Sequence, residues 1–194
     1  MAGASGEMRE SHTMSVPLSP AGVWQIDTNH TQVGFSVKHL GISTVHGWFT
    51  EYAGEARIGA DLDSTSVELT AATSTINTGN TWRDGHLVGE HFFDADRFPT
   101  MAFASTVVEA AGDAYRIVGD LTIRDVTRSV MFDVLFAGTS VFPVDDLLHA
   151  GFLATTTIKR TDFDMGYGVP VASDDVDVRL NVQLIAPKDS TVET

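Results

Sequence analysis

Hydrophobic and polar positions alternate along most of the chain between residues 33 and 185. In VGFSVKHL, for example, Val33, Phe35 and Val37 share one face with His39, and small or polar residues take the other face. The same period of two recurs in YRIVGDLTIRD, RSVMFDVLFAG and DVDVRLNVQLI, and more weakly in GWFTEYAGEARI, SVELTAATSTI, TMAFASTVVEA and GFLATTTIKR. Turn signals such as AAGD and FAGTS separate these segments. The pattern predicts about eight antiparallel strands in an all-β barrel or sandwich.

The alternation stops in TWRDGHLVGEHFFDADRFPTMAFAST, residues 81–106, where charged side chains surround two phenylalanines. Asn80 is suited to cap a helix that begins directly after it. Pro99 marks the return to extended chain, and Gly85 and Gly89 disfavour one long helix. We therefore expect a short helical connection near residues 81–95 that lies across the mouth of a barrel.

Composition narrows the class of protein. A length of 194 residues favours a single domain, and a hydrophobic fraction of 43% is enough for one core. The 26 acidic residues outnumber the 12 basic ones, for a formal net charge of −14. This charge argues against nucleic acid as a partner and disfavours anionic membrane surfaces. The chain has no cysteine, so disulfides and thiolate sites are excluded.

The two ends of the chain lack the apolar periodicity of the middle. We expect residues 1–20 and 188–194 to be flexible tails on either side of a barrel domain of residues 21–187. The first segment has no continuous apolar stretch of the kind found in secretion signals, which predicts a cytoplasmic protein. No segment approaches the roughly twenty apolar residues of a membrane span, so we expect no stable membrane insertion.

Four segments together resemble a known family. WQIDTNHTQVGFSVKHLGISTVHGWF, STINTGNTWRDGHLVGEHFFDADRFPTMAFAST, GDLTIRDVTRSVMFDV and KRTDFDMG are similar to the YceI family of lipocalin-like polyisoprenoid-binding proteins, from about Val23 to Ile185. The resemblance implies an extended eight-stranded antiparallel lipocalin-like β-barrel around a long apolar tunnel that holds an isoprenoid chain. Asp125 and Asp164 stand where the family usually has glycine. Both are turn positions, where aspartate is tolerated, so local loop shape is affected rather than the fold.

The candidate tunnel residues are mostly large apolar side chains on one face of each strand or in the helical connection. They are Phe35, Val37, Phe49, Phe92, Phe93, Phe103, Gly119, Leu121, Ile123, Phe132 and Phe152. By pattern alone these side chains could also fill a solid core, because an eight-stranded barrel is at the size where either arrangement is found. We expect Gly119 to leave room for a ligand, because it lacks a side chain and shares a face with Leu121 and Ile123.

The charged cluster in the connection admits several interpretations. No metal site is indicated, because His86 and His91 are five residues apart and do not form an HExxH pattern. Asp84 and His86 could supply an acid–base pair, but no nucleophile motif accompanies them. Arg83 and Asp84 can instead anchor the connection to the barrel rim through the planar hydrogen bonds of a guanidinium group. Alternatively, Arg83, with His39 or His86, contacts the polar head of a lipid.

A second charged pair, Arg160 and Asp162, stands at a strand end, where we expect it to fix a turn. As a whole, the sequence favours a protein that binds, stores or transports a long isoprenoid lipid of the quinone or polyprenyl phosphate type, with no cofactor and no catalytic step. The alternative is a small enzyme that acts on a hydrophobic substrate with Arg83, Asp84 and His86. A third hypothesis is a stress-response module that sequesters amphiphiles broadly. Homodimer formation is left open.

Overall fold

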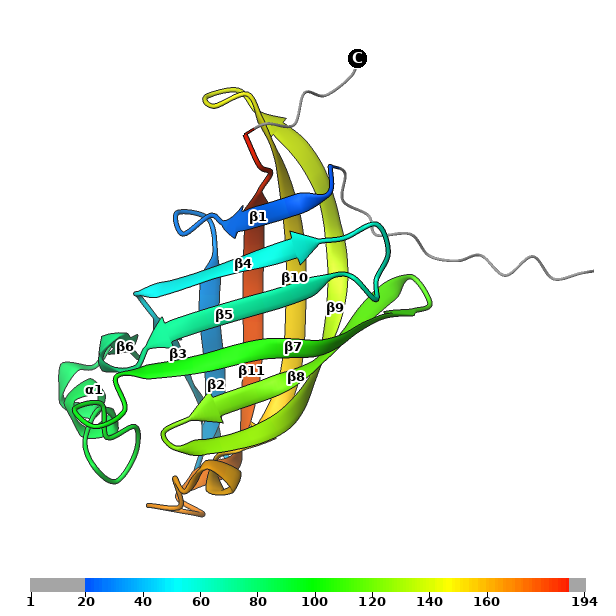
Figure 1. Ribbon diagram of the computed structural model, residues 1–194. Helices are drawn as coiled ribbons and strands as arrows, with labels where there is room; N and C mark the ends of the chain where they lie inside the picture. The colour runs from blue at the N-terminus through cyan, green and yellow to red at the C-terminus, as the bar shows by residue number, and fades with distance from the viewer. Residues whose placement is uncertain (1–19, 189–194) are drawn as a thin grey trace, which may run out of the picture.

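The computed structural model describes residues 20–188, which form one antiparallel sheet wrapped into a barrel (Figure 1). Its strands are β1 (Gly22–Ile26), β2 (Gln32–His39), β3 (Ser43–Phe49), β4 (Tyr52–Ile58), β5 (Ser66–Ala72), β6 (Ile76–Asn77), β7 (Thr100–Ala111), β8 (Ala114–Ile123), β9 (Val126–Phe142), β10 (Leu147–Lys159) and β11 (Ala172–Ile185). The helices are α1 (Thr81–Leu87) and the short 3-10 helices η1 (Thr73–Thr75) and η2 (Arg160–Phe163). The predicted tails fall almost entirely outside the described residues.

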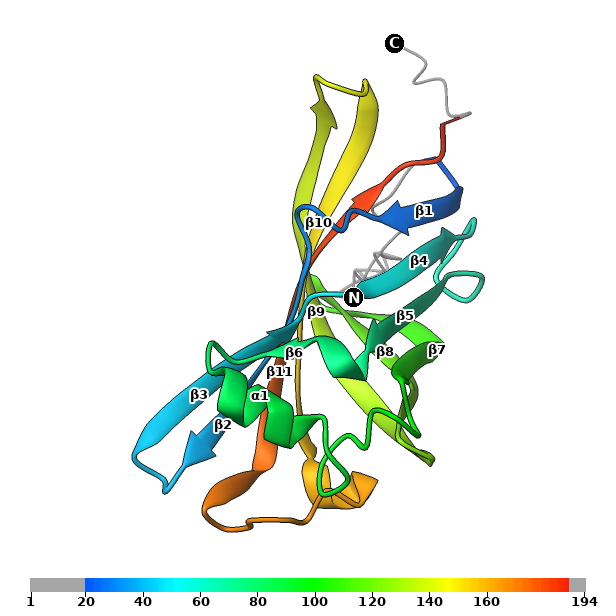
Figure 2. The same ribbon diagram turned by 90° about the vertical axis from the view of Figure 1, so that its left-hand side faces the viewer.

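Eight strands close into a ring in the order β1-β4-β5-β7-β8-β9-β10-β11. The ring closes where β11 returns to β1, with Gln25 opposite Ile185 and Ile26 opposite Leu184. Strands β2, β3 and β6 continue the sheet from β11 and lie on the α1 side of the molecule (Figure 2). The predicted eight-stranded antiparallel barrel with one short helix is therefore confirmed.

Several details of the predicted strands differ. The turn expected at FAGTS is absent, because residues 136–140 lie within β9, and the segment SVELTAATSTI is interrupted by η1 between β5 and β6. The segment GWFTEYAGEARI is not one strand, because it ends β3 and then begins β4 after a turn at Thr50 and Glu51. At this turn the strand hydrogen bonds are interrupted. The Thr50 N–H donates to the Thr75 carbonyl oxygen at 3.2 Å, and the Glu51 N–H donates to Thr75 Oγ1 at 3.2 Å. The five-residue strand β1 was not predicted, because it is too short to display a clear alternation.

The helical connection begins and ends where the sequence predicts. Asn80 has extended backbone geometry, and its side chain accepts a hydrogen bond of 3.0 Å from the Arg83 N–H, as an N-cap does. The helix ends at Leu87, before Gly89, and extended chain resumes directly after Pro99 with β7. Within residues 20–188, no helix has the length and hydrophobicity needed to cross a lipid bilayer.

Apolar side chains inside the barrel form two adjoining clusters. Beside β1, Trp24 is completely buried with Ala150 and Leu184, and its Nε1 donates to the Pro20 carbonyl oxygen at 3.0 Å. The larger cluster lies nearer α1 and includes several phenylalanines from different strands. Side chains of both clusters line the space described next, including Ala56, Ile58 and Leu184 of the Trp24 cluster, although Trp24 itself does not.

Candidate functional site

An apolar cavity of about 740 Å³ occupies the barrel interior. This volume is in the range of ligand pockets in proteins. Its walls include every predicted tunnel residue except one: Phe35, Val37, Phe49, Phe92, Phe93, Phe103, Leu121, Ile123, Phe132 and Phe152. Of the two arrangements that the sequence left open, the structure has a hollow barrel rather than a solid core.

The predicted tunnel residue that does not line the cavity is Gly119. A Cβ built at this position would lie 2.5 Å from Cζ of Phe103 and even closer to the Ala104 carbonyl oxygen. Real Cβ atoms do not approach other atoms so closely. The prediction that Gly119 leaves room for a ligand is therefore wrong, because the Phe103 ring of the neighbouring strand β7 already fills that room.

Except for Glu68 of β5, the exposed side chains of the cavity lining lie beside α1, where we place the mouth of the cavity. The exposed side chains of its lining at this end come from the β2–β3 hairpin and from the start of the helical connection; they are Lys38, His39, Ser43, Asn80, Trp82 and His86. Phe92 and Phe93 of the connection line the cavity beneath this opening, and Phe93 meets the ring of Phe49 edge to face at 5.6 Å. The helical connection thus covers part of the mouth of the cavity, in agreement with the expectation that it lies across the mouth of the barrel. The sequence analysis did not single out Trp82, whose ring stands 79% exposed at the mouth.

Arg83 and Asp84 hold the helix to the chain that precedes it. The guanidinium group of Arg83 donates from Nε to Thr78 Oγ1 at 2.7 Å and from Nη2 to the Thr78 carbonyl oxygen at 2.9 Å. The carboxylate of Asp84 accepts from the Thr78 N–H at 2.9 Å and from its hydroxyl at 2.5 Å. Thr78 is buried, so each of its polar atoms needs such a partner. These contacts fit the anchor interpretation, although Arg83 also lines the cavity.

His86 contacts aromatic rings rather than carboxylates. Its ring centroid lies 5.9 Å from Trp82, 5.4 Å from Phe92 and 5.7 Å from Tyr167. In the described structure Asp84 directs its hydrogen bonds to Thr78, and none joins it to His86. Across residues 20–188, no three histidine or carboxylate side chains converge to hold a metal ion. The three polar residues proposed for an enzyme therefore do not form an acid–base pair in this structure.

Arg160 is an anchor of a different kind. It is buried and donates from Nε to the Ser173 carbonyl oxygen at 2.9 Å, and from Nη2 to that of Ala172 at 2.9 Å. Its Nη1 donates to the carbonyl oxygens of Met165 and Tyr167. Burial lowers the pKa of Arg160, which the negative charge nearby on β11 partly offsets. One guanidinium group thus closes the whole loop from η2 to β11.

The carboxylate that fixes this turn is not Asp162, the one expected from the sequence. Asp162 is exposed and makes no hydrogen bond to Arg160. Instead, Asp174 of β11 accepts from the Thr161 N–H at 2.9 Å and from its hydroxyl at 2.8 Å. The prediction that Asp162 fixes this turn is therefore wrong, because the turn is closed by a residue that is near only in the folded chain. At the end of η2, Asp164 takes left-handed backbone geometry with φ of 58°, which aspartate tolerates better than most residues.

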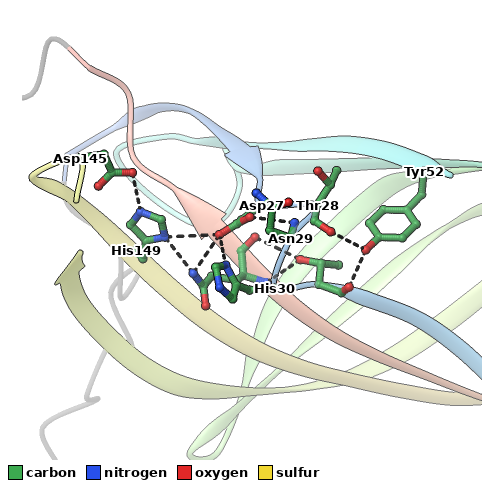
Figure 3. Close-up of polar contacts among 9 residues, drawn as sticks. Asp27, Thr28, Asn29, His30, Tyr52, Asp145 and His149 are labelled. Carbon is green, nitrogen blue, oxygen red and sulfur yellow. Dashed lines mark hydrogen bonds and ion pairs between the residues drawn. The ribbon is translucent and has the colours of Figure 1, made fainter. Parts of the chain in front are cut away.

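A partly buried polar network, with Asp27 and His149 buried, lies near β1, at the end of the barrel away from α1 (Figure 3). At its centre the carboxylate of Asp27 accepts from His30 Nδ1 at 2.7 Å and from Gln183 Nε2 at 3.1 Å. Gln183 Nε2 also donates to His149 Nδ1 at 2.8 Å, and His149 Nε2 donates to Asp145 at 3.1 Å. These contacts join the β1–β2 loop to the β9–β10 hairpin and β11.

The network is internally satisfied and separate from the cavity. Burial alone would raise the pKa of Asp27, but the hydrogen bonds from His30 and the Asn29 N–H and the nearby imidazoles of His30 and His149 outweigh it. The pKa of Asp27 therefore lies below its ordinary value of 3.8. Burial and the charge of Asp27 raise the pKa of Tyr52, whose hydroxyl donates to the Thr28 carbonyl oxygen at 3.1 Å. None of these residues lines the cavity. The only feature of the local sequence that could have indicated this network is the turn sequence DTNH, residues 27–30.

The geometry defines a class first: an antiparallel β-barrel that encloses a ligand-sized apolar cavity and opens beneath a helical connection. The chain belongs to the YceI family, since the YceI-like domain matches residues 24–184. A UPF0312 protein of Pectobacterium atrosepticum is 33% identical over 160 residues, which cover 82% of this chain and 83% of that relative.

Solved structures show the same fold. BcnA of Burkholderia cenocepacia is similar with a TM-score of 0.73 at 22% identity, over 84% of this chain and 99% of that chain. A polyisoprenoid binding domain from Saccharophagus degradans is similar with a TM-score of 0.63 at 15% identity, over 84% of this chain and 98% of that chain. At these identities the likeness concerns the fold alone.

Proposed function

We propose that this protein binds a long isoprenoid lipid in the barrel cavity and stores or carries it without changing it chemically. The observation that carries the proposal is the hollow apolar interior, whose walls are built by phenylalanine, leucine, isoleucine and valine side chains from most strands of the barrel. Membership of the YceI family and the fold shared with a polyisoprenoid binding domain support the same class of ligand.

The apolar walls are sufficient to hold such a ligand. Burial of a chain of about twenty carbons contributes roughly 16 kcal/mol at about 0.8 kcal/mol per methylene group. The loss of translational, rotational and conformational freedom offsets part of this gain, by about 4–15 kcal/mol. About 1–12 kcal/mol remains, and micromolar binding needs about 8 kcal/mol. Where the cost is about 8 kcal/mol or less, the apolar walls alone give micromolar or tighter binding, and the polar groups at the mouth are left to select the head group.

We assign the head group to the mouth, beside His39, Arg83 and His86, and favour the quinone or polyprenyl phosphate class. Each of these three residues lines the cavity on the side where it meets solvent. Arg83 commits Nε and Nη2 to Thr78, and within residues 20–188 its Nη1 makes no hydrogen bond. A cationic donor there suits a phosphate or a carbonyl oxygen. Neither a cofactor nor a metal ion takes part in this proposal, and we place the protein in the cytoplasm.

The test is mass spectrometry of the organic extract of gently purified protein, together with native mass spectrometry after titration with geranylgeraniol. We expect one isoprenoid per barrel and saturable uptake of the added alcohol. A barrel that takes up no geranylgeraniol and releases no isoprenoid would contradict the proposal.

The binding function and the enzyme alternative differ in what happens to the ligand. We expect bound quinone or polyprenyl phosphate to remain chemically unchanged over hours, with or without added zinc or magnesium. Turnover that disappears in Asp84→Asn or His86→Gln would overturn the binding function, because Asp84 here serves only to hold Thr78.

A further inference from the structure

Three segments that are distant in the sequence surround the mouth of the cavity. They are residues 38–43 at the β2–β3 turn, residues 80–87 around α1, and residues 166–171 in the loop before β11, and we call them the rim segments. The loop touches both of the others: the Leu40 N–H donates to the Val171 carbonyl oxygen at 2.7 Å, and the rings of His86 and Tyr167 lie 5.7 Å apart. Figures 1 and 2 show all three at the same end of the barrel.

Bulky apolar side chains point from the rim segments into solvent. Ile42 is 84% exposed and Trp82 is 79% exposed. The other large apolar side chains exposed on these segments are Leu40, Tyr167, Val169 and Val171. Scattered apolar residues are ordinary on protein surfaces, but a group of them around one opening marks a surface that binds a partner.

The charge of the rim segments differs from that of the whole chain. They contain two permanent cations, Lys38 and Arg83, and two histidines, against one carboxylate, Asp84, which is held by Thr78. The chain as a whole has a formal net charge of −14. The rim segments themselves therefore disfavour a surface of phosphate groups less than the net charge of the chain implies.

The opposite end of the molecule has a second exposed apolar tip, which provides a comparison. In the β9–β10 hairpin, Val144 is 81% exposed, close to the value for Ile42. However, Asp145 and Asp146 follow it directly, and the hairpin tip does not line the cavity. Of these two exposed apolar surfaces, only the rim segments also have few carboxylates and border the cavity.

We propose that the rim segments dock the protein onto the surface of a lipid bilayer, with the mouth of the cavity facing the membrane. The inference rests on the proposed function, because an apolar ligand that passes between a bilayer and the cavity through this mouth avoids water. Tryptophan and tyrosine side chains favour the boundary between lipid and water, where Trp82 and Tyr167 would lie. The docking is peripheral: the apolar tips enter the head-group region, and no element spans the bilayer.

The experiment is flotation of the full-length protein with vesicles of palmitoyl-oleoyl phosphatidylcholine. Two variants are compared with the natural protein: Ile42→Asp at the rim and Val144→Asp at the opposite tip, which replace equally exposed apolar side chains. Neither residue lines the cavity, so we expect both variants to keep their melting temperature and to take up geranylgeraniol delivered from ethanol. We expect the natural protein to float, Ile42→Asp to lower its vesicle affinity about tenfold or more, and Val144→Asp to change it less than twofold.

Failure of the docking proposal can be distinguished from failure of the proposed function. If the protein takes up geranylgeraniol but does not float with vesicles, the docking proposal is overturned and the binding function stands. Equal loss of flotation in the two variants would overturn it as well, because the rim would then have no special role. If Ile42→Asp converts a dimer into a monomer on size-exclusion chromatography and vesicle binding is absent, the rim is covered by a second copy of the chain, and the membrane proposal is wrong.

Discussion

Replacement of Ala154 by leucine should narrow the cavity without unfolding the barrel. Ala154 lies on β10 opposite Leu180 of β11, and it lines the cavity. Four residues earlier on the same strand, Ala150 is 1% exposed and packs in the Trp24 cluster, and it does not line the cavity. The two alanines share a face of one strand because four residues are two periods of a strand. The same substitution can therefore be compared at a position that lines the cavity and at a buried position that does not.

The expected magnitudes follow from the two environments. Ala150 is almost completely buried and does not line the cavity, so we expect overpacking by the three added carbons to lower the free energy of unfolding by about 1–3 kcal/mol. At position 154 they extend into the cavity, so we expect a change of less than about 1 kcal/mol in the ligand-free protein. The same three carbons displace about three ligand carbons, which corresponds to about 2.4 kcal/mol, or roughly 60-fold weaker binding of a long isoprenoid.

Urea unfolding of the ligand-free protein measures the first quantity, and titration with geranylgeraniol followed by native mass spectrometry measures the second. A shorter isoprenoid alcohol, such as geraniol, should lose less affinity, because it can avoid the narrowed section. The reasoning is refuted if Ala154→Leu is as destabilising as Ala150→Leu while the affinity for geranylgeraniol is unchanged. That result would mean that the space beside Ala154 does not receive the ligand.

Three further predictions concern the polar contacts. Arg160→Lys should lower the free energy of unfolding by about 3 kcal/mol, because one ammonium group cannot reach four backbone carbonyls. An unchanged midpoint of urea unfolding would contradict the anchor role. Arg83→Ala should lower the free energy of unfolding of the ligand-free protein by about 1–3 kcal/mol, since the buried Thr78 loses two hydrogen-bond donors. If only the affinity for lipid falls, Arg83 contacts the head group of the ligand and is not an anchor. Because the pKa of Asp27 is lowered in the folded state, its stabilisation is present above the ordinary pKa of 3.8 and is lost as pH falls through the lower folded value. Thermal unfolding between about pH 2 and 6 should therefore show a weaker acid dependence for Asp27→Asn, and identical curves would argue against the network.

The alternation of apolar and polar residues predicted an antiparallel barrel or sandwich and identified most residues of the cavity wall, and the resemblance to the YceI family selected the barrel. In a strand, side chains point alternately to the two faces, so that the period of two assigns Phe35, Leu121 and Phe132 to the inside before any partner strand is known. The capping of α1 by Asn80 is equally local, since it depends on residues three positions apart. Such features can be predicted because the interacting atoms are close in the sequence.

Other features were decided by pairs of residues from different parts of the chain. Gly119 has no room beside it because of Phe103 on the neighbouring strand, and Asp174 rather than Asp162 holds the turn after η2. Whether the interior is hollow also depends on how side chains from many strands meet, which the pattern of any single strand does not contain.

The sequence by itself thus determined the direction of each side chain along a strand and the position of the helical break. Only the tertiary structure decided which polar groups meet and where the cavity opens. The contacts between Asp27 and Gln183 and between Leu40 and Val171 join residues more than a hundred positions apart. The reason is that local backbone geometry sets the direction of a side chain, whereas its neighbours depend on the closure of the whole barrel.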